Sequence, residues 1–472
     1  MDTSKWAQFA PDFKTVISSD GEKVQLDDPR VAHVFPVDMT PWGLEYAKHS
    51  YERRGMRCRV SKRTTAETLQ SGKTLSNGRE CIPVVAMLGE IYEDLMQNRQ
   101  DGEITIYYLF YVPGPCQHGG WKIMFDTFIE RLQLKDVVFL AWPTRENNYL
   151  GNGFLWSLDL RMGYAIGDLM DEAENVVRCL AVDQLQGMKT FRDECTKALK
   201  EASAGLVAME PALRKWAQAV SQIPLKASLA GTPKVLIFGG GNVWWLHYEV
   251  TDYFIERGIV PKLVDTTEFL SWAERRPVTG YNFKIGKSSA EQGFNVDGIY
   301  SSLRDSNISL ALKGEGEVAL DMMTKIWMGE HFRKWLRDIA ARSGLLFDEH
   351  AEQEAIFDVS ANIVNPMSAS EAINNVGKFI VSAKGKVFDG LVNLRVFNCP
   401  VAGGTVAFLA TAANDLEMPF VALDVEGPQV SANQRRLLET LAVQAVRSRS
   451  AKDNATNAGR PAAVKAADTM TV

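Results

Sequence analysis

Short apolar runs alternate with amphipathic segments over two long stretches of this chain. Residues 30–39 (RVAHVFPVDM) form an apolar run that predicts a buried strand, and residues 41–55 predict a helix. Pro41 stands in the first turn of that helix, and Gly55 stands at its end. The run at 56–61 (MRCRVS) predicts a second strand. Strand, helix and strand in this order are typical of a βαβ unit, which requires a parallel sheet covered by helices.

The alternation defines two α/β regions that are separated by helical sequence. We therefore predict an α/β fold with two Rossmann/flavodoxin-like lobes, each with a parallel sheet, joined by helical segments. A helical insertion is expected in the second lobe, and small polar residues near the end predict a disordered tail. The predicted boundaries are an N-terminal lobe at 1–154, a helical bridge at 155–230, a C-terminal lobe at 231–447 with its insertion around 317–347, and a tail at 448–472.

The overall composition excludes several classes of partner. Hydrophobic residues make up 46% and charged residues 23% of the 472 residues, which is the balance of a globular protein with ample core. The net charge of −6 favours no nucleic-acid partner. No apolar run approaches the roughly 20 residues of a membrane span, and the N-terminal residues do not resemble a secretory signal. We therefore expect a cytoplasmic protein.

Three of the six cysteines share one local context. Cys81 stands just before a predicted helix, and Cys116 and Cys399 each follow a predicted strand and precede a helix. Ligands of α/β proteins collect at the carboxyl ends of parallel strands, where helix N-termini also favour negative charge. Three thiolates gathered there suit a soft metal or an iron–sulfur cluster. Cysteine also packs as a small hydrophobic residue, so the residues alone leave a cluster site and ordinary loop cysteines equally open.

The other three cysteines have a different context. Cys58 lies within a predicted strand, whereas Cys179 and Cys195 lie within predicted helices, on or near apolar faces. This placement favours buried packing residues.

Three positions around the cysteine edge are candidates to surround a cluster. His118 and Gly119 belong to the Cys116 loop, and Glu146 follows a strand that ends at the same edge. His118 is suited to donate a hydrogen bond to a cluster sulfur, and Glu146 to contact a polar substrate. A solvent-facing histidine and a simple turn explain these residues equally well.

Two glycine motifs are weaker signals. Gly72-Lys73-Thr74 has the tail of a phosphate-binding loop, but Glu67 stands where the motif needs its first glycine, so we reject it. The run FGGGN at 238–242 follows a strand and is suited to hold a phosphate, although a tight strand-to-helix turn is the simpler interpretation.

Three blocks around the cysteines resemble a known family. They are GRECIPVVAMLGEIYEDL around Cys81, YVPGPCQHGGWKIMFDTFIERLQLKDV around Cys116 and GLVNLRVFNCPVAGGT around Cys399. In order and context these blocks resemble the signature blocks of the 2-hydroxyacyl-CoA dehydratase and benzoyl-CoA reductase superfamily, in particular its acyl-CoA dehydratase activase-related branch. The resemblance extends over about residues 30–443 and includes the start of the second lobe at 233–272.

The resemblance implies a [4Fe–4S] cluster held between the lobes by Cys81, Cys116 and Cys399. A single cubane per chain, or clusters shared across a dimer, is favoured over a double-cubane cluster, because only three cysteines align. Relatives use such clusters for low-potential electron transfer and reductive or radical chemistry on CoA thioesters, in dehydratase- or reductase-type components. The resemblance also implies a homodimer or a related iron–sulfur subunit as partner.

This sequence departs from the family pattern in its motifs and in its modules. The residues after the second and third cysteines, 117–121 and 400–404, differ from the family motifs, so the reaction stays open. The ATPase module of some members has no counterpart here, which implies a separate ATP-hydrolysing activator. The alternatives are a non-catalytic scaffold or assembly subunit of a redox complex, and a cofactor-free α/β protein.

Overall fold

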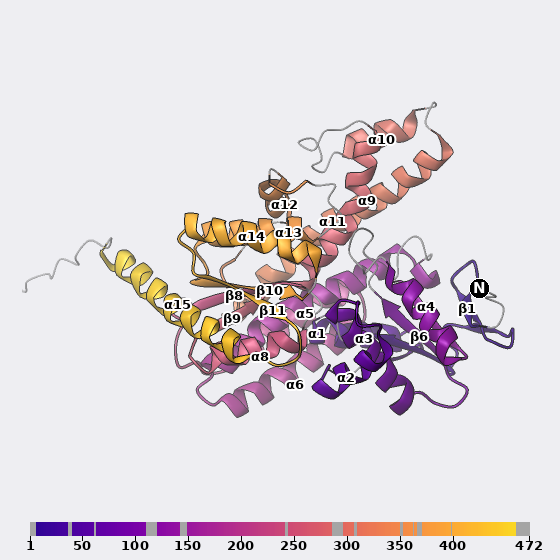
Figure 1. Cartoon of the computed structure of the whole chain (residues 1–472), viewed down its shortest axis with the longest axis horizontal. Helices are drawn as coiled ribbons and strands as arrows, with labels where there is room; N and C mark the ends of the chain where they lie inside the picture. Colours follow the sequence, from indigo (N-terminus) through magenta and orange to yellow (C-terminus); the bar gives the residue numbers. More distant parts are fainter. Residues whose placement is uncertain are drawn as a thin grey trace, which may run out of the picture.

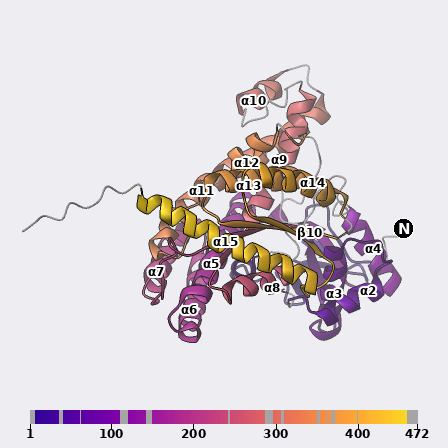
Figure 2. The ribbon, with the colours of Figure 1, turned by 60° about the vertical axis from the view of Figure 1, so that its left-hand side comes forward.

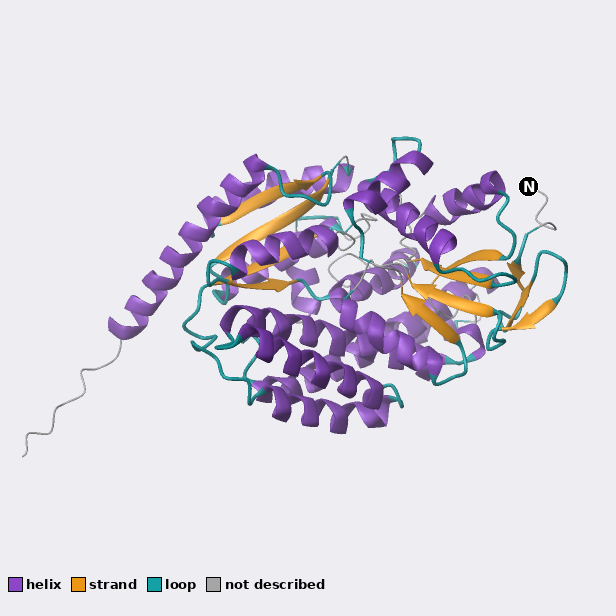
Figure 3. Cartoon of the chain, turned by 90° about the horizontal axis from the view of Figure 1, so that it is seen from below, coloured by secondary structure: helices purple, strands orange, loops and turns teal. Residues whose placement is uncertain are grey.

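The described chain forms two parallel four-stranded sheets, each flanked by helices (Figure 1). In this computed structural model the described residues are 6–35, 40–60, 63–109, 120–141, 149–240, 244–285, 296–305, 309–349, 353–361, 363–365, 371–397 and 399–458. Figure 3 shows the two sheets as separate groups of strands with helices between and around them. The predicted α/β fold with two Rossmann/flavodoxin-like lobes is confirmed.

The first sheet contains the βαβ unit expected from the N-terminal sequence. Its strand order is β5-β4-β6-β7, and all neighbours are parallel. Every residue of β4 is buried, because helices cover both faces of the strand. The elements of this sheet and the helices that cover it are β4 (Val31–Phe35), α1 (Pro41–Glu52), β5 (Arg57–Val60), α2 (Ala66–Leu75), α3 (Ile82–Gln97), β6 (Ile104–Leu109), α4 (Trp121–Leu132) and β7 (Val137–Ala141).

The second sheet repeats the topology of the first. Its order is β11-β10-β8-β9, again all parallel. If the strands of each sheet are numbered in chain order, both sheets read 2-1-3-4, which is the beginning of the flavodoxin-like order. The long helix α15 runs along one face of this sheet (Figure 2). The strands and helices that directly flank them are β8 (Lys234–Gly239), α8 (Trp244–Ile255), β9 (Val260–Leu263), β10 (Gly390–Val396), α14 (Pro400–Asp415), β11 (Phe420–Val425) and α15 (Ala432–Ala458).

The helical sequence between the lobes forms three long helices, as predicted: α5 (Phe154–Leu180), α6 (Gln184–Ala202) and α7 (Leu206–Val220). The first of them, α5, is buried along nearly its whole length and packs on α1 of the first lobe and on β9 of the second. It therefore belongs to the core that joins the two lobes.

A helical insertion separates β9 from β10. Helix α10 and the adjoining ends of α9 and α11 project away from the sheets (Figure 1). The sequence indicates helix over 317–347, and α11 covers most of that range and begins earlier. The inserted elements are α9 (Thr266–Lys284), α10 (Val296–Arg304), α11 (Leu310–Ala340), the short 3-10 helix η5 (Ala341–Ser343), α12 (Gln353–Ala361) and α13 (Ala372–Gly385).

The structure differs from the sequence expectations at both ends of the described chain. A small antiparallel sheet precedes the first lobe, with strands β1 (Gln8–Phe9), β2 (Thr15–Ile17) and β3 (Lys23–Gln25). Helix α15 continues beyond residue 448, where we expected a disordered tail, and ends at Ala458. Ion pairs of Arg449 and Lys452 with Asp389 of the second lobe hold this last part of the helix. Among the described residues, no helix has the length and apolar character needed to cross a membrane.

Candidate functional site

Cys81 and Cys399 both stand at the start of a helix, as the sequence predicts. Cys81 is the N-cap of α3, and its carbonyl oxygen accepts hydrogen bonds from the backbone N–H groups of Val84 and Val85 at 3.1 and 3.3 Å. Cys399 is the N-cap of α14 and follows β10 at the carboxyl edge of the second sheet. Both cysteines are partly exposed, so neither is a fully buried packing residue.

The two cysteines come from different lobes and contact the same hydrophobic cluster. This cluster lies between the second sheet and helices α8 and α15, and both Cys81 and Cys399 pack against it. Cys81 also packs against the core that α3 forms with the first sheet. The start of α3 therefore bridges the cores of the two lobes, and it brings its cysteine to the same hydrophobic cluster as the cysteine of the other lobe.

The electrostatic surroundings of Cys399 only partly match the sequence expectation. Burial raises the pKa of the Cys399 thiol, and the nearby backbone N–H groups of Ala402 and Val401 act in the opposite direction. The sulfur forms no capping hydrogen bond. The Glu371 carboxylate also raises the pKa of Cys399. The helix N-terminus therefore favours the thiolate, as expected, but burial outweighs it.

Glu371 occupies the position in the second lobe that Cys81 occupies in the first. Glu371 is the N-cap of α13, which precedes β10, and Cys81 is the N-cap of α3, which precedes β6. In chain order, β10 and β6 are each the third strand of their sheet. In the sequence, Cys116 and Cys399 follow that third strand, β6 or β10. Desolvation of the carboxyl group raises the pKa of Glu371 to about 7. In the second lobe this topology brings Glu371 close enough to Cys399 to act on its pKa.

The remaining predicted site residues lie outside the described residues. These are Cys116, His118, Gly119 and Glu146. Within the described part of the chain, no group of three or more His, Cys, Asp or Glu side chains is arranged to hold a metal ion. The described part therefore contains two of the three predicted cluster ligands.

The three cysteines with apolar surroundings are packing residues, as predicted. Cys58 on β5, Cys179 on α5 and Cys195 on α6 are all buried. Burial raises the pKa of each thiol, to about 11 for Cys179. The indole N–H of Trp216 donates a hydrogen bond to the Cys195 sulfur at 3.2 Å.

One glycine of each glycine motif, Gly72 and Gly239, has a structural explanation. Gly72 lies within α2, where a Cβ atom would overlap the carbonyl oxygen of Val85 on α3, so this glycine serves helix packing. Gly239 has φ of 128°, and a Cβ atom there would overlap the carbonyl oxygen of Leu394. Close packing against β10 therefore accounts for Gly239. Gly241 and Asn242 of the same run lie outside the described residues.

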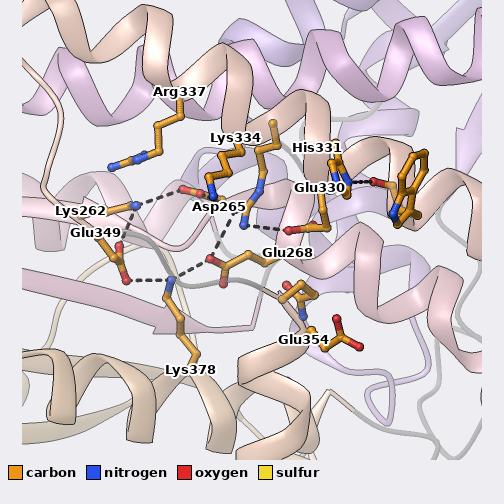
Figure 4. A pocket seen from close by; sticks show the side chains of 13 residues that line it. Lys262, Asp265, Glu268, Glu330, His331, Lys334, Arg337, Glu349, Glu354 and Lys378 are labelled. Carbon is orange, nitrogen blue, oxygen red and sulfur yellow. Dashed lines mark hydrogen bonds and ion pairs between the residues drawn. The ribbon is translucent and has the colours of Figure 1, made fainter. Parts of the chain in front are cut away.

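A buried network of charged side chains is a second candidate site, which the sequence analysis missed (Figure 4). The Lys262 ammonium on β9 lies 3.1 Å from a Glu172 oxygen and 2.9 Å from a Glu349 oxygen. The Lys378 ammonium on α13 lies 2.7 Å from Glu268 and 3.0 Å from Glu349. These five side chains come from five separate segments and are almost inaccessible to solvent.

Two arginines of α11 complete the network. Both Arg337 guanidinium NH₂ groups donate to the Glu172 carboxylate, at 2.9 and 3.0 Å, and one also donates to the Phe347 carbonyl oxygen. The Arg333 guanidinium group lies 3.2 Å from the carboxylate of Asp265, which stands just after β9 in the chain. Each buried charge thus has an opposite charge within reach, which is the condition for keeping it ionised in the interior.

The network shifts the ionisation of its members. Burial alone would lower the pKa of Lys262, but Asp265, Glu172 and Glu349 together raise it. Burial raises the pKa of Glu268, and Lys378 only partly opposes this. Asp168 on α5 lies beside the network and accepts hydrogen bonds from Thr266 and Thr267; burial and the charge of Asp265 raise its pKa to about 7.

A weak signal of this network is present in the sequence. Lys262 interrupts the apolar run of β9, and Lys378 interrupts the apolar face of α13. Single charges in such positions are unusual in a core, because they require partners. The partners lie far away along the chain, so the pattern does not identify them.

Comparison of the chain with protein-family models finds no match, and a search of curated proteins finds none.

Proposed function

We propose that this cytoplasmic protein binds one [4Fe–4S] cluster through Cys81, Cys116 and Cys399. The cluster would serve low-potential electron transfer, or reductive or radical chemistry on a CoA-thioester-like substrate. An ATP-hydrolysing activator protein would supply the electron, and the chain would act as a homodimer or with a related iron–sulfur subunit. The single observation that carries this proposal is the contact of Cys81 and Cys399, from different lobes, with the same hydrophobic cluster.

The repeated topology supports the inclusion of Cys116. Glu371 and Cys399 stand at equivalent points to Cys81 and Cys116, and Glu371 is close enough to shift the pKa of Cys399. By the same topology, Cys116 is expected close to Cys81. Two cysteines of the first lobe and one of the second would then form the ligand set.

The chemistry of the donor set fits a cluster. Iron–sulfur clusters are held by thiolates, and iron supplies the positive charge that stabilises a thiolate in a buried place. The raised pKa of Cys399 favours the neutral thiol when no cation is near. Binding of the cluster therefore releases protons, and its affinity is expected to rise with pH.

The test is anaerobic purification followed by iron and sulfide quantification and EPR spectroscopy. Wild type is expected to hold about four irons per chain, as a [4Fe–4S] cluster requires. Cys399→Ala and Cys116→Ala are expected to lose most of this iron. Cys179→Ala is the matched control, since this cysteine is buried away from the helix starts, and it is expected to keep the cluster.

Two outcomes contradict the proposal. One is wild-type protein that contains no iron although it was made and kept without oxygen. The other is equal iron content in Cys399→Ala and Cys179→Ala. A loaded cluster without reaction on acyl-CoA thioesters in the presence of an ATPase activator would instead favour the scaffold alternative.

A further inference from the structure

The buried charge network surrounds a cavity of about 490 Å³. Its volume is within the usual range of small-molecule sites, roughly 300–1,000 Å³. Among the described residues that line it, neither Cys81 nor Cys399 is present. The described lining residues come from β9, the connection from β9 to α9, α9, α11, the segment before α12, α12 and α13 (Figure 4).

Among the described residues that line the cavity, acidic and basic side chains are equal in number. Five are basic (Lys262, Arg333, Lys334, Arg337 and Lys378) and five are acidic (Asp265, Glu268, Glu330, Glu349 and Glu354). Lys262, Arg333, Arg337 and Lys378 already have carboxylate partners between 2.7 and 3.2 Å. An anion would therefore compete with carboxylates that are built into the wall. A metal ion would face the same lysines and arginines at short range, and the resulting repulsion disfavours it.

The unsatisfied polar atoms of the lining are acceptors. Glu268 and Gln353 are each 1% exposed, and within the described part of the chain Glu268 Oε2 and Gln353 Oε1 have no hydrogen-bond partner. The other oxygen of Glu268 is held by Lys378, and the Gln353 amide NH₂ donates to Asn374 at 2.8 Å. A buried acceptor without a donor is energetically unfavourable, so these atoms favour a ligand that donates hydrogen bonds.

An aromatic surface lies at the rim of the cavity. Trp327 is 55% exposed and its ring lies 4.4 Å from that of His331, one turn further along α11. His331 Nδ1 lies 2.9 Å from the Trp327 carbonyl oxygen, which can only accept, so Nδ1 carries the proton. In the neutral ring, Nε2 is then a further acceptor.

We infer that this cavity binds a neutral, hydroxyl-rich small molecule of the sugar or polyol class. Its hydroxyl groups would donate to Glu268 Oε2 and Gln353 Oε1, and its apolar C–H face would pack on the Trp327 ring. A neutral ligand leaves the balanced charges of the wall intact. An amine would instead place a positive charge beside Lys378 and Arg333.

The experiment is isothermal titration calorimetry of the full chain with D-glucose, D-ribose and myo-inositol. Putrescine and inorganic phosphate probe a cationic and an anionic ligand. At least one of the three hydroxyl compounds is expected to bind saturably. Trp327→Ala is expected to weaken this binding about tenfold, or about 1.4 kcal/mol, because the ligand loses its packing on the aromatic ring. Tyr300→Ala is the control, since Tyr300 is also an exposed aromatic residue but does not line the cavity.

A second variant tests the acceptors. Gln353→Met keeps the approximate size of the side chain but removes its oxygen, and it is expected to weaken binding of the same compound about tenfold. Circular dichroism melting of each variant verifies that it is folded. The inference is overturned if no hydroxyl compound binds, or if only putrescine or phosphate binds. Sugar binding that Trp327→Ala and Gln353→Met leave unchanged would also overturn it.

Discussion

Gly72 and Gly89 let α2 and α3 pack with their backbones in contact. A Cβ atom at Gly72 would overlap the Val85 carbonyl oxygen, and one at Gly89 would overlap the Thr68 carbonyl oxygen. Both obstacles are backbone atoms, which cannot move aside as a flexible side chain can. The close approach places α2 against α3, whose N-cap is Cys81. At the scale of single residues, these two glycines thus determine how closely the two helices pack.

Gly72→Ala is expected to lower the free energy of unfolding by about 3 kcal/mol, because the added methyl group forces the two helices apart. Gly314→Ala is the control: Gly314 is also helical, in α11, but a Cβ atom there meets open space. The control is expected to stabilise the protein by up to about 1 kcal/mol, through higher helix propensity. Urea denaturation measures both values, and equal effects of the two substitutions would refute the close-packing explanation.

The buried side chain of His33 makes the stability of the fold depend on pH. Its Nε2–H group donates to the Leu26 carbonyl oxygen at 2.9 Å, and Nδ1 accepts from the Tyr108 hydroxyl at 2.8 Å. Burial lowers the pKa of His33 to about 4. The unfolded chain therefore takes up a proton near pH 6.5, whereas the folded chain does so only near pH 4. His33 thus contributes stability above pH 6.5 that is lost as the pH falls towards 4.

The expected loss from this group is about 3 kcal/mol between pH 6.5 and 4. His33→Gln keeps a donor for Leu26 but cannot be protonated, so its stability is expected to depend less steeply on pH. Chemical denaturation of wild type and variant at pH 7 and 4.5 measures the difference. An equal change in the free energy of unfolding between the two pH values in both proteins would contradict the lowered pKa of His33.

At the scale of elements, the last turns of α15 are held by a buried acid. Asp389, just before β10, is completely buried, and its carboxylate lies 3.0 Å from Arg449 and 2.8 Å from Lys452. It also accepts a hydrogen bond from the Lys234 backbone N–H at 2.9 Å. The two cations explain why the helix continues beyond residue 448. The small polar residues of this segment predict disorder, because the sequence does not show that two of its cations pair with Asp389.

A chain that ends at Arg447 is expected to lose about 3 kcal/mol of stability, since Asp389 keeps a buried charge without its cations. The same truncation in Asp389→Asn protein is expected to cost much less, because a neutral amide needs no cation. Thermal and urea denaturation of the four proteins give the coupling energy. A truncation cost that Asp389→Asn does not reduce would mean that α15 is held by its apolar contacts alone.

At the scale of the whole molecule, Glu172 connects three parts of the fold. It extends from α5, the helix shared by both lobes, to Lys262 on β9 and Arg337 on α11. It also accepts a hydrogen bond from the Phe347 backbone N–H. The helical bridge, the second sheet and the insertion are therefore joined through one carboxylate. The same network forms the wall of the cavity, so overall stability and the cavity are coupled.

Glu172→Ala is expected to destabilise the protein by about 3–5 kcal/mol, because it leaves Lys262 and Arg337 buried with fewer partners. Glu210→Ala is the control, as Glu210 forms only a surface pair with Arg214 on α7, and its cost is expected to be about 0.5 kcal/mol or less. Denaturation followed by both fluorescence and circular dichroism measures the two effects. A similar loss in the free energy of unfolding for both variants would contradict the conclusion that Glu172 joins these three parts of the fold.

Particular residues show how far the sequence predicts this structure. The run at 30–39 and the Pro41 helix start predict β4 and α1, because burial and capping are local properties. The helix-start positions of Cys81 and Cys399 are predictable for the same reason. Helix α2 was missed, since its residues are mostly polar and its glycine is explained only by the neighbouring helix. The packing of Cys81 against the core of the other lobe likewise cannot be predicted from either segment alone.

The sequence by itself determined the α/β class, most of the strands and helices of the two sheets, and the helix-start positions of Cys81 and Cys399, because each depends on patterns within one segment. Only the tertiary structure decided which buried charges meet. Lys262 and Glu349 are 87 residues apart in the chain, and Glu172 and Arg337 are 165 apart. A buried charge requires a partner but places no condition on where in the chain that partner stands. Charge compensation over such separations arises only when the lobes, the bridge and the insertion are packed together.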